Sequence, residues 1–282
     1  MYETHFGFRE LPFCLTPDTD FYLDSRGHAE ASLVLDVCIR GGEGFIKIAG
    51  EVGTGKTMLC RRLLSRLPPN FTTIYVPNPF LSPEGLFHAI AHELGIRTAS
   101  VNPHVVMKLI EEELIQLAVL GNKAILVVDE AQSMPVETLE ALRLVTNLET
   151  EKFKLLQVVL FGQPELDAIL EQPALRQLRQ RITFAYRLTP LLPEDVRDYI
   201  NHRLARAGYV GHQLFEDKAI KLIAQASRGI PRLVNVLAHK ALVNAYGKGV
   251  IRVNKALVLT AIDDTESVSR PKLSLFSFGS SA

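Results

Sequence analysis

One glycine-rich stretch constrains this chain more than any other feature: residues Gly50–Thr57 read GEVGTGKT. The pattern is a glycine, four free positions and then Gly-Lys-Thr, which is the signature of a phosphate-binding loop. It lies between an apolar run, Phe45–Ala49, and a helical run, Met58–Leu67. The alternative is a glycine-rich turn with an incidental lysine, but a chance match would rarely fall between a strand and a helix. The stretch therefore predicts a nucleotide phosphate site.

Each residue type in this loop has a separate chemical reason. The glycines let the backbone curve around a phosphate with its N–H groups pointing inward. The helix that follows presents unpaired N–H groups and its positive dipole end to the same anion. We expect the lysine to reach the β and γ phosphates and the threonine hydroxyl to bind Mg²⁺. The predicted nucleotide-binding residues are Gly50, Glu51, Val52, Gly53, Thr54, Gly55, Lys56, Thr57 and Met58.

Composition limits the class of protein. The 282 residues are 47% hydrophobic and 22% charged, which is ordinary for a globular protein of one large domain or one domain plus a smaller one. Basic and acidic residues are equal at 31 each, so no global field attracts nucleic acid and any such binding would need a local patch.

Other features of the sequence favour a cytoplasmic protein. Cys14, Cys38 and Cys60 are odd in number and far apart, so they predict neither a disulfide framework nor a zinc site. The first residues do not form a signal peptide, and no apolar run approaches the roughly 20 residues that span a bilayer. Any work at a membrane would therefore be peripheral.

We expect residues 1–43 to form an N-terminal arm and helix that pack on the core. The arm carries several aromatic side chains among prolines and turn formers. One interpretation is a packed arm only. Another places the arm, with His28–Glu30 and the helix to about Ile39, beside an adenine ring.

Strands and helices alternate across residues 44–190, the predicted core. This alternation indicates an α/β fold with a parallel sheet covered on both faces. After the first strand and helix, the predicted strands are Phe71–Val76, Ala124–Val128, Leu155–Phe161 and Thr183–Leu188, and the predicted helices are Pro83–Gly95 and Val105–Leu120.

Two acids follow the apolar strand at Ala124–Val128. Ligands of open α/β sheets bind beyond the carboxyl ends of the strands, so Asp129 and Glu130 should face the phosphate loop. Adjacent acids after a strand are often only a turn or a helix cap. With the loop upstream, we expect Asp129 to hold the Mg²⁺ shell and Glu130 to polarise the attacking water.

Further polar residues follow later strands. Gln163 follows Leu155–Phe161 and is placed to sense the γ-phosphate, although it could be an ordinary turn residue. Arg176, Arg179 and Arg181 precede the last strand. Such a cluster is usually a solvated face or a nucleic-acid patch, but in an oligomeric ATPase one arginine could act in the neighbouring subunit's site.

From Pro190 onward the pattern predicts helices alone. Proline at helix starts and glycine at helix ends divide residues 191–266 into four helices, which we interpret as a small lid. Arg232 follows Gly229-Ile230-Pro231 and could couple the lid to the γ-phosphate. We expect residues 267–282 to be a disordered tail, with Phe276 and Phe278 as a possible docking peptide.

The motifs taken in order resemble those of the AAA+ ATPases of the ExeA/GspA type, which serve general secretion and type IV pilus assembly. The resemblance runs from Tyr2 to about Glu266. It rests on these segments: GEVGTGKT, VVDEAQ, FGQPEL, LRQRI and GIPR.

This resemblance implies a five-stranded AAA+ core with strand order 5-1-4-3-2, a helical lid and ATP hydrolysis with Mg²⁺. It implies Lys56 and Thr57 on the phosphates and Mg²⁺, Asp129 and Glu130 as the Walker B pair, and Gln163 and Arg232 as sensors. Many AAA+ proteins carry asparagine in place of Gln163. Arg179 and Arg181 are the candidate trans-acting arginines.

The resemblance also implies a homo-oligomer that acts with secretion or pilus proteins, of the MSHA type, at the inner membrane. Secretion members continue into a membrane span and a periplasmic region, which we do not find in this sequence. Two alternatives stay open: a DNA-associated transposition helper, which the zero net charge argues against, and a nucleotide-gated scaffold with little turnover.

Overall fold

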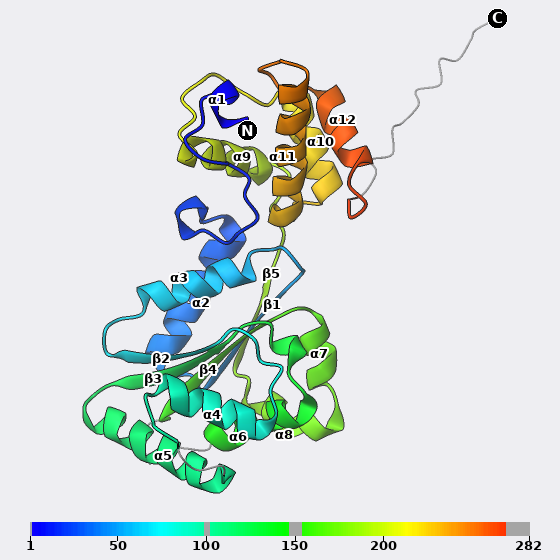
Figure 1. Cartoon of the computed structure of the whole chain (residues 1–282). Helices are drawn as coiled ribbons and strands as arrows, with labels where there is room; N and C mark the ends of the chain where they lie inside the picture. The colour runs from blue at the N-terminus through cyan, green and yellow to red at the C-terminus, as the bar shows by residue number, and fades with distance from the viewer. Residues whose placement is uncertain (1, 99–101, 147–153, 269–282) are drawn as a thin grey trace, which may run out of the picture. The chain divides into compact units, whose positions relative to one another are not determined.

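The chain forms two compact units in this computed structural model, which describes residues 2–98, 102–146 and 154–268 (Figure 1). The core unit comprises Arg26–Thr189. The helical unit joins Met1–Ser25 to the residues from Pro190 onward. Phe276 and Phe278, predicted as a docking peptide, lie outside the described residues.

The core unit is built on a parallel sheet of five strands in the order β2-β3-β4-β1-β5. This confirms the predicted order, read from the opposite edge. Register is set by pairs such as Phe45 with Val158 and Ile46 with Phe184. The strands are β1 Phe45–Gly50, β2 Phe71–Val76, β3 Lys123–Val128, β4 Leu156–Gly162 and β5 Phe184–Leu188.

Helices cover both faces of this sheet, as Figure 1 shows. Central strands buried on both faces are expected to be continuously apolar, and Ala124–Val128 of β3 is at most 2% exposed. One face carries α2 Arg26–Gly41 and α3 Lys56–Arg66. The other carries α4 Pro83–Glu93, α5 Pro103–Val119, α6 Val136–Thr146, α7 Glu165–Leu170 and α8 Arg176–Arg181.

Local capping explains where the helices begin. The Ser82 hydroxyl accepts a hydrogen bond from the Gly85 N–H at 3.1 Å, directly before α4. The Asn102 side chain accepts one from the His104 N–H at 2.9 Å, so α5 begins at Pro103. That start is two residues before the predicted one at Val105, because the asparagine cap was not recognised. In the core unit, the helices α6, α7 and α8 were not predicted.

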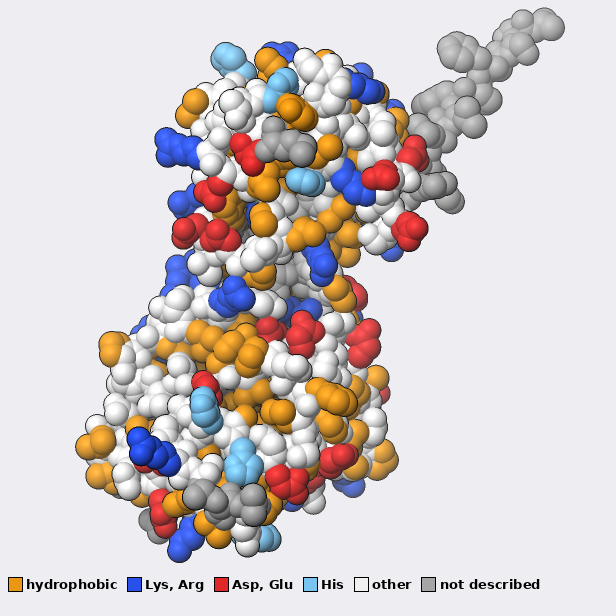
Figure 2. Space-filling view, viewed as in Figure 1, with side chains coloured by type: hydrophobic (Ala, Val, Ile, Leu, Met, Phe, Trp, Pro, Cys, Tyr) orange, Lys and Arg blue, Asp and Glu red, His pale blue; other side chains and the backbone are white. Residues whose placement is uncertain are grey.

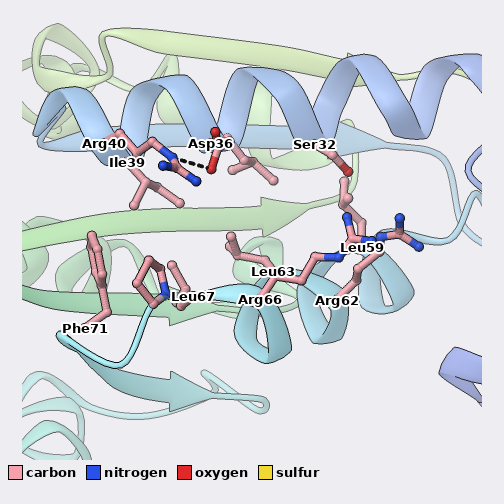
Figure 3. A pocket seen from close by; sticks show the side chains of 12 residues that line it. Ser32, Asp36, Ile39, Arg40, Leu59, Arg62, Leu63, Arg66, Leu67 and Phe71 are labelled. Carbon is pink, nitrogen blue, oxygen red and sulfur yellow. Dashed lines mark hydrogen bonds and ion pairs between the residues drawn. The ribbon is translucent and has the colours of Figure 1, made fainter.

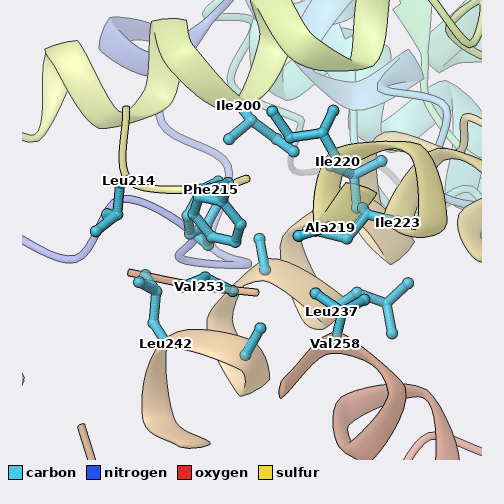
Figure 4. Packing of buried hydrophobic residues seen from close by; sticks show 14 of the residues in the cluster. Ile200, Leu214, Phe215, Ala219, Ile220, Ile223, Leu237, Leu242, Val253 and Val258 are labelled. Atoms are coloured by element: carbon cyan, nitrogen blue, oxygen red, sulfur yellow. The ribbon is translucent and has the colours of Figure 1, made fainter. Parts of the chain in front are cut away.

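The helical unit packs four longer helices around one apolar centre (Figure 4). Phe215, Leu237 and Val258 are at most 2% exposed there. Gly229 has a φ of +73°, and a Cβ at this position would lie 2.0 Å from the Leu191 carbonyl oxygen, so only glycine fits the turn before α11. The helices are α9 Asp195–Arg206, α10 Asp217–Ser227, α11 Pro231–Gly247 and α12 Lys255–Asp263.

The N-terminal arm belongs to the helical unit, which corrects the prediction that residues 1–43 pack on the core. Only α2, from Arg26, packs on the core sheet. The arm includes the short helix α1 Glu3–Phe6 and the 3₁₀ turn η1 Thr19–Phe21, and its buried aromatic rings join the same cluster as α9–α12. The Tyr2 hydroxyl also lies 2.8 Å from His239 Nδ1 of α11. Large aromatic rings require apolar cover, and the helices after Pro190 supply it.

A buried arginine fastens this arm. Arg203 of α9 is 7% exposed and donates from Nε to the Pro12 carbonyl at 2.5 Å and from Nη2 to the Cys14 carbonyl at 3.2 Å. Its guanidinium also lies over the Phe21 ring, 4.8 Å from the centroid. Arg203 therefore satisfies backbone carbonyls that a buried arm would otherwise leave unpaired.

We predict that Arg203→Ala loosens residues 1–25 and lowers the free energy of unfolding by roughly 2–4 kcal/mol, because two charge-assisted hydrogen bonds are lost and two carbonyls lose their partners. Chemical denaturation and limited proteolysis of the arm measure the effect. Arg206→Ala, an exposed position on the same helix, is the control. Equal stability and equal cleavage of the two variants would contradict the assignment.

Candidate nucleotide-binding site

The loop between β1 and α3 has the backbone shape that its glycines predict. Gly53 and Gly55 have φ values of +82° and +98°, in the region that side chains disfavour. A Cβ on Gly50 would lie 3.0 Å from both the Leu188 carbonyl and Thr54 Oγ1. The buried Thr54 hydroxyl donates to the Glu51 carbonyl at 2.8 Å and so braces the turn. Val52 is 53% exposed, and Met58 is half-buried in the first turn of α3.

Lys56 begins α3 and is 5% exposed. Its Nζ donates to the Gly50 carbonyl at 2.8 Å and to the Glu51 carbonyl at 3.1 Å. Burial lowers the pKa of this lysine, and the carboxylates of Glu130 and Asp129 oppose that shift. The structure therefore fixes an ammonium group inside the loop, where an anion would meet it.

Thr57 and Asp129, the two predicted Mg²⁺ ligands, lie together. Asp129 follows β3 and is 3% exposed, and its carboxylate accepts hydrogen bonds from the Thr57 side chain and, at 3.0 Å, from the Glu130 N–H. Burial raises the pKa of this carboxyl, although the two hydrogen bonds favour the ionised form. A hydroxyl and a carboxylate in hydrogen-bonding contact offer the oxygen ligands that Mg²⁺ prefers.

Glu130 has an uncommon backbone conformation, and two side-chain amides bind its carboxylate. Its φ of +53° lies in the left-handed region, which costs a residue other than glycine about 1–2 kcal/mol. Its Oε2 accepts from Gln132 Nε2 at 2.6 Å and from Gln163 Nε2 at 3.0 Å. The Gln163 N–H in turn donates to Gln132 Oε1 at 2.9 Å. Two strand ends thus converge on one carboxylate.

Gln132 is a site residue that the sequence reasoning missed. It lies in the 3₁₀ turn η2, Ala131–Ser133, directly after Glu130. The signal was present, because Gln132 closes the segment VVDEAQ that carries the family resemblance. The side chain bonds both to Glu130 and to the backbone of Gln163, so it links the ends of β3 and β4.

The start of α2 also reaches this site. His28 is buried, and a Cβ on Gly55 would lie 2.7 Å from its Nε2. The imidazole therefore packs directly against the phosphate loop. The sequence predicted that residues including His28–Glu30 lie beside an adenine ring. Of these three residues, His28 packs against the phosphate loop.

The arginine cluster lies elsewhere on the core unit. Arg176 and Arg179 are exposed on α8, and Arg181 donates from Nη1 to the Thr146 carbonyl at 3.4 Å. The helix leads into the beginning of β5, where the Thr183 N–H donates to the Phe45 carbonyl at the beginning of β1. The amino ends of the strands therefore lie beside α8, whereas the phosphate loop lies at their carboxyl ends. Arg181 therefore makes no contact with its own subunit's loop among the described residues.

Arg232 belongs to the helical unit. It is the second residue of α11 and is exposed. The turn before it is fixed by the Gly229 carbonyl, which accepts from the Leu191 N–H at 2.9 Å, and by the Ser227 hydroxyl, which accepts from the Gly229 N–H at 3.2 Å. The position of this predicted sensor within its own unit is thus well defined.

The loop, its buried lysine and the acids after β3 define a P-loop domain of the AAA type, a fold that binds nucleotides. A family model described as an AAA domain matches residues 39–170. General secretion pathway protein A of Aeromonas hydrophila is 42% identical over 250 residues, which are 88% of this chain and 46% of that protein. The resemblance to AAA+ ATPases of the ExeA/GspA type is therefore confirmed, although the chain spans less than half the length of that relative.

Solved structures show the same fold. Cdc6p from Pyrobaculum aerophilum is similar with a TM-score of 0.68 and 18% identity, over 90% of this chain and 70% of that one. The ORC2 protein of Aeropyrum pernix gives 0.63 and 18%, over 90% and 73%. The Thermotoga maritima RuvB branch migration motor gives 0.58 and 20%, over 87% and 73%. At these identities the comparison concerns the fold alone.

We predict that Asp129→Asn raises the thermal midpoint of the protein without nucleotide. Burial raises the pKa of Asp129 in the folded state, so the ionised carboxylate disfavours folding above that pKa, and the cost disappears as the group is protonated at lower pH. The midpoint should rise by about 2–4 °C for each kcal/mol relieved, and the gain should shrink as the pH falls. Thermal melts between about pH 5 and pH 8 measure this, and a destabilised variant at neutral pH would refute it.

Proposed function

We propose that this protein binds ATP with Mg²⁺ and hydrolyses the γ-phosphate as an AAA+ ATPase. The observation that carries the proposal is the placement of Glu130. Its carboxylate is held by Gln132 and Gln163 at the same sheet edge as Lys56 and the Thr57–Asp129 pair. A scaffold that only binds nucleotide would not need an oriented carboxylate there.

The residues present suit the nucleotide. The N–H groups of the loop and the start of α3 would bind phosphate oxygens, and Lys56 would turn from its own loop carbonyls to the β and γ phosphates. Thr57 and Asp129 would hold Mg²⁺, and His28, which packs against Gly55 of the loop, is proposed to border the nucleoside. Magnesium and ATP supply the electrophilic phosphorus and the charge neutralisation of the reaction.

The chain's own contribution is to orient water and accept its proton. Glu130 Oε2 already receives two amide N–H groups, whereas Oε1 makes no hydrogen bond with a described residue and is the oxygen available to the water. Gln163 can donate either to Glu130 or to an oxygen of the γ-phosphate, so it would report whether the phosphate is present. Gln132 is a positioning residue, because it acts through Glu130 and Gln163.

We propose the cellular role by analogy with a relative. The similarity to General secretion pathway protein A supports a role in the assembly of a secretion machine, or in the biogenesis of a type IV pilus of the MSHA type. Its partners would be assembly proteins at the inner membrane. Among the described residues, none of the helices combines the length and the hydrophobicity of a membrane span.

Turnover is proposed to depend on a homo-oligomer. Arg179 and Arg181 lie at the sheet edge opposite their own phosphate loop, so either could act only in the site of a neighbouring subunit. Arg232, at the start of α11, is proposed to couple the helical unit to the nucleotide state. Both roles rest on the family resemblance.

We predict that two substitutions separate binding from hydrolysis. Lys56→Ala should reduce ATP affinity at least about tenfold, because the buried ammonium is lost. Glu130→Gln should leave affinity within about twofold and lower turnover about 100-fold or more, because the amide cannot accept the proton. Fluorescent-nucleotide titration and phosphate release at several protein concentrations measure both. Full turnover in Glu130→Gln, or unchanged affinity in Lys56→Ala, would overturn the site assignment.

We also predict a role for Gln132 that a structural residue would not show. Gln132→Ala should lower kcat about tenfold with KM for ATP little changed, because Glu130 loses its 2.6 Å donor while the phosphate loop stays intact. Gln132→Glu should be worse, since it places a second carboxylate against the first. The exposed Gln180→Ala in α8 is the control. A raised KM with unchanged kcat would contradict the positioning role.

A further inference from the structure

An open groove separates α2 from α3 on the face of the core sheet that both helices cover (Figure 3). Its empty volume, including the mouth, is about 620 Å³. The floor is apolar: Leu35 and Leu59 are 1% exposed and Ile39 is 2% exposed, with the half-buried Phe71 at the far end.

Arginines line the mouth of the groove. Arg40, Arg62 and Arg66 contribute three guanidinium groups and Asp36 a single carboxylate, so the lining carries a formal charge of +2. Asp36 already pairs with Arg40 at 2.7 Å. Within the part of the chain that the structure describes, Arg66 forms no ion pair. The groove therefore suits an apolar segment that carries carboxylates.

The groove is distinct from the nucleotide site. The phosphate loop lies at the carboxyl ends of the strands and precedes α3, whereas the groove follows α3 to Leu67 and Pro68 and ends at Phe71, the first residue of β2. The last residues that line the groove thus lie at the amino ends of the strands, away from the phosphate loop. No residue of Gly50–Thr57 lines it.

A matching surface exists on the other face of the same unit. One side of α5 buries Val106, Ile110 and Leu114 against the core, while its outer side exposes Ile115 by 42% and Val119 by 81%. Leu120, directly after the helix, is 75% exposed. In Figure 2, apolar side chains are visible at the edge of the core unit where α5 meets β3 in Figure 1.

Glutamates accompany this apolar stripe. Glu111, Glu112 and Glu113 are consecutive in α5, and Lys108 is its one lysine or arginine, so the formal charge of the helix is −2 with histidine neutral. Glu112 is exposed one turn before Ile115 and lies 3.9 Å from Lys108. The stripe and its carboxylates complement the groove in both polarity and charge.

We propose that the α2–α3 groove binds the exposed side of α5 from a second copy of this chain. The groove and α5 lie on opposite faces of one sheet, so a subunit cannot satisfy its own groove. A contact between two different surfaces is head-to-tail, and repetition of it gives a ring or a filament. This inference rests on the oligomer in the proposed function and names the surfaces that build it.

The composition of the groove favours a protein occupant over a lipid surface. Its cations are all arginine, with no lysine, and arginine is enriched and lysine depleted at protein interfaces. Membrane-binding segments generally need clusters of about 4–8 basic residues, and three arginines offset by an aspartate fall short of that. The aliphatic floor also matches branched side chains such as those of Ile115 and Val119.

A charge exchange tests this contact. Arg66→Glu places a carboxylate opposite the α5 glutamates, and Glu112→Arg places a guanidinium opposite the groove arginines, so each variant alone should self-associate at least about tenfold more weakly. An equimolar mixture of the two should associate like the wild type. In the mixture, the altered groove of the Arg66→Glu subunit meets the altered helix of the Glu112→Arg subunit, and the unaltered groove meets the unaltered helix.

Sedimentation velocity of the full chain over a concentration series, with ATP and Mg²⁺, measures association. Arg61→Glu, an exposed position of α3 outside the groove, is the control and should associate normally. Thermal melts check that each variant folds. A monomeric wild type, unaffected single variants, or no recovery in the mixture would each overturn the proposal, as would loss of binding to anionic vesicles in Arg66→Glu with normal self-association.

The same variants separate this inference from the proposed function. Nucleotide affinity should be unchanged in Arg66→Glu and Glu112→Arg, because neither residue touches the phosphate loop. If ATP binds and oligomers persist in both variants, the groove assignment fails and the ATPase proposal stands. If the wild type binds no ATP, the ATPase proposal fails whatever the sedimentation shows.

Discussion

Two buried ions of opposite charge at one sheet edge are the constraint on which the core unit depends. Lys56 is 5% exposed and Asp129 is 3% exposed, and removing such groups from water is costly unless hydrogen bonds replace the lost solvation. The loop carbonyls satisfy the ammonium, while the Thr57 side chain and the Glu130 N–H satisfy the carboxylate. These partners meet only if the carboxyl ends of the parallel strands lie close together. The site therefore depends on the order of the strands in the sheet.

The sequence predicted the parts of this arrangement whose signals are local. A glycine pattern before a helix located the phosphate loop, and an apolar run before two acids located Asp129 and Glu130. Strand alternation and the family resemblance gave the sheet. The same reasoning missed Gln132, because its role appears only when the ends of β3 and β4 lie together and its side chain can bond across them.

The misplaced arm shows a second limit of sequence reasoning. The aromatic residues of positions 1–25 indicated that the segment is buried, but burial does not say against which surface. The surface that covers the arm includes Arg203, which is 191 residues from Pro12 in the sequence and donates a hydrogen bond to the Pro12 carbonyl. Likewise, the sequence shows a cluster of arginines at 176–181, but it does not show that α8 lies at the amino ends of the strands.

Helix α3 physically joins the nucleotide site to the proposed interface. Its first residues are Lys56 and Thr57, and its last, Arg66, lines the groove about 15 Å away at roughly 1.5 Å per residue. Leu59 and Cys60 are at most 1% exposed and seat the helix on the sheet, so a displacement at one end cannot be absorbed by a loop between the two sites. A phosphate that draws the Lys56 ammonium from its loop carbonyls would therefore act on the same rigid element that carries Arg66, a residue of the proposed interface.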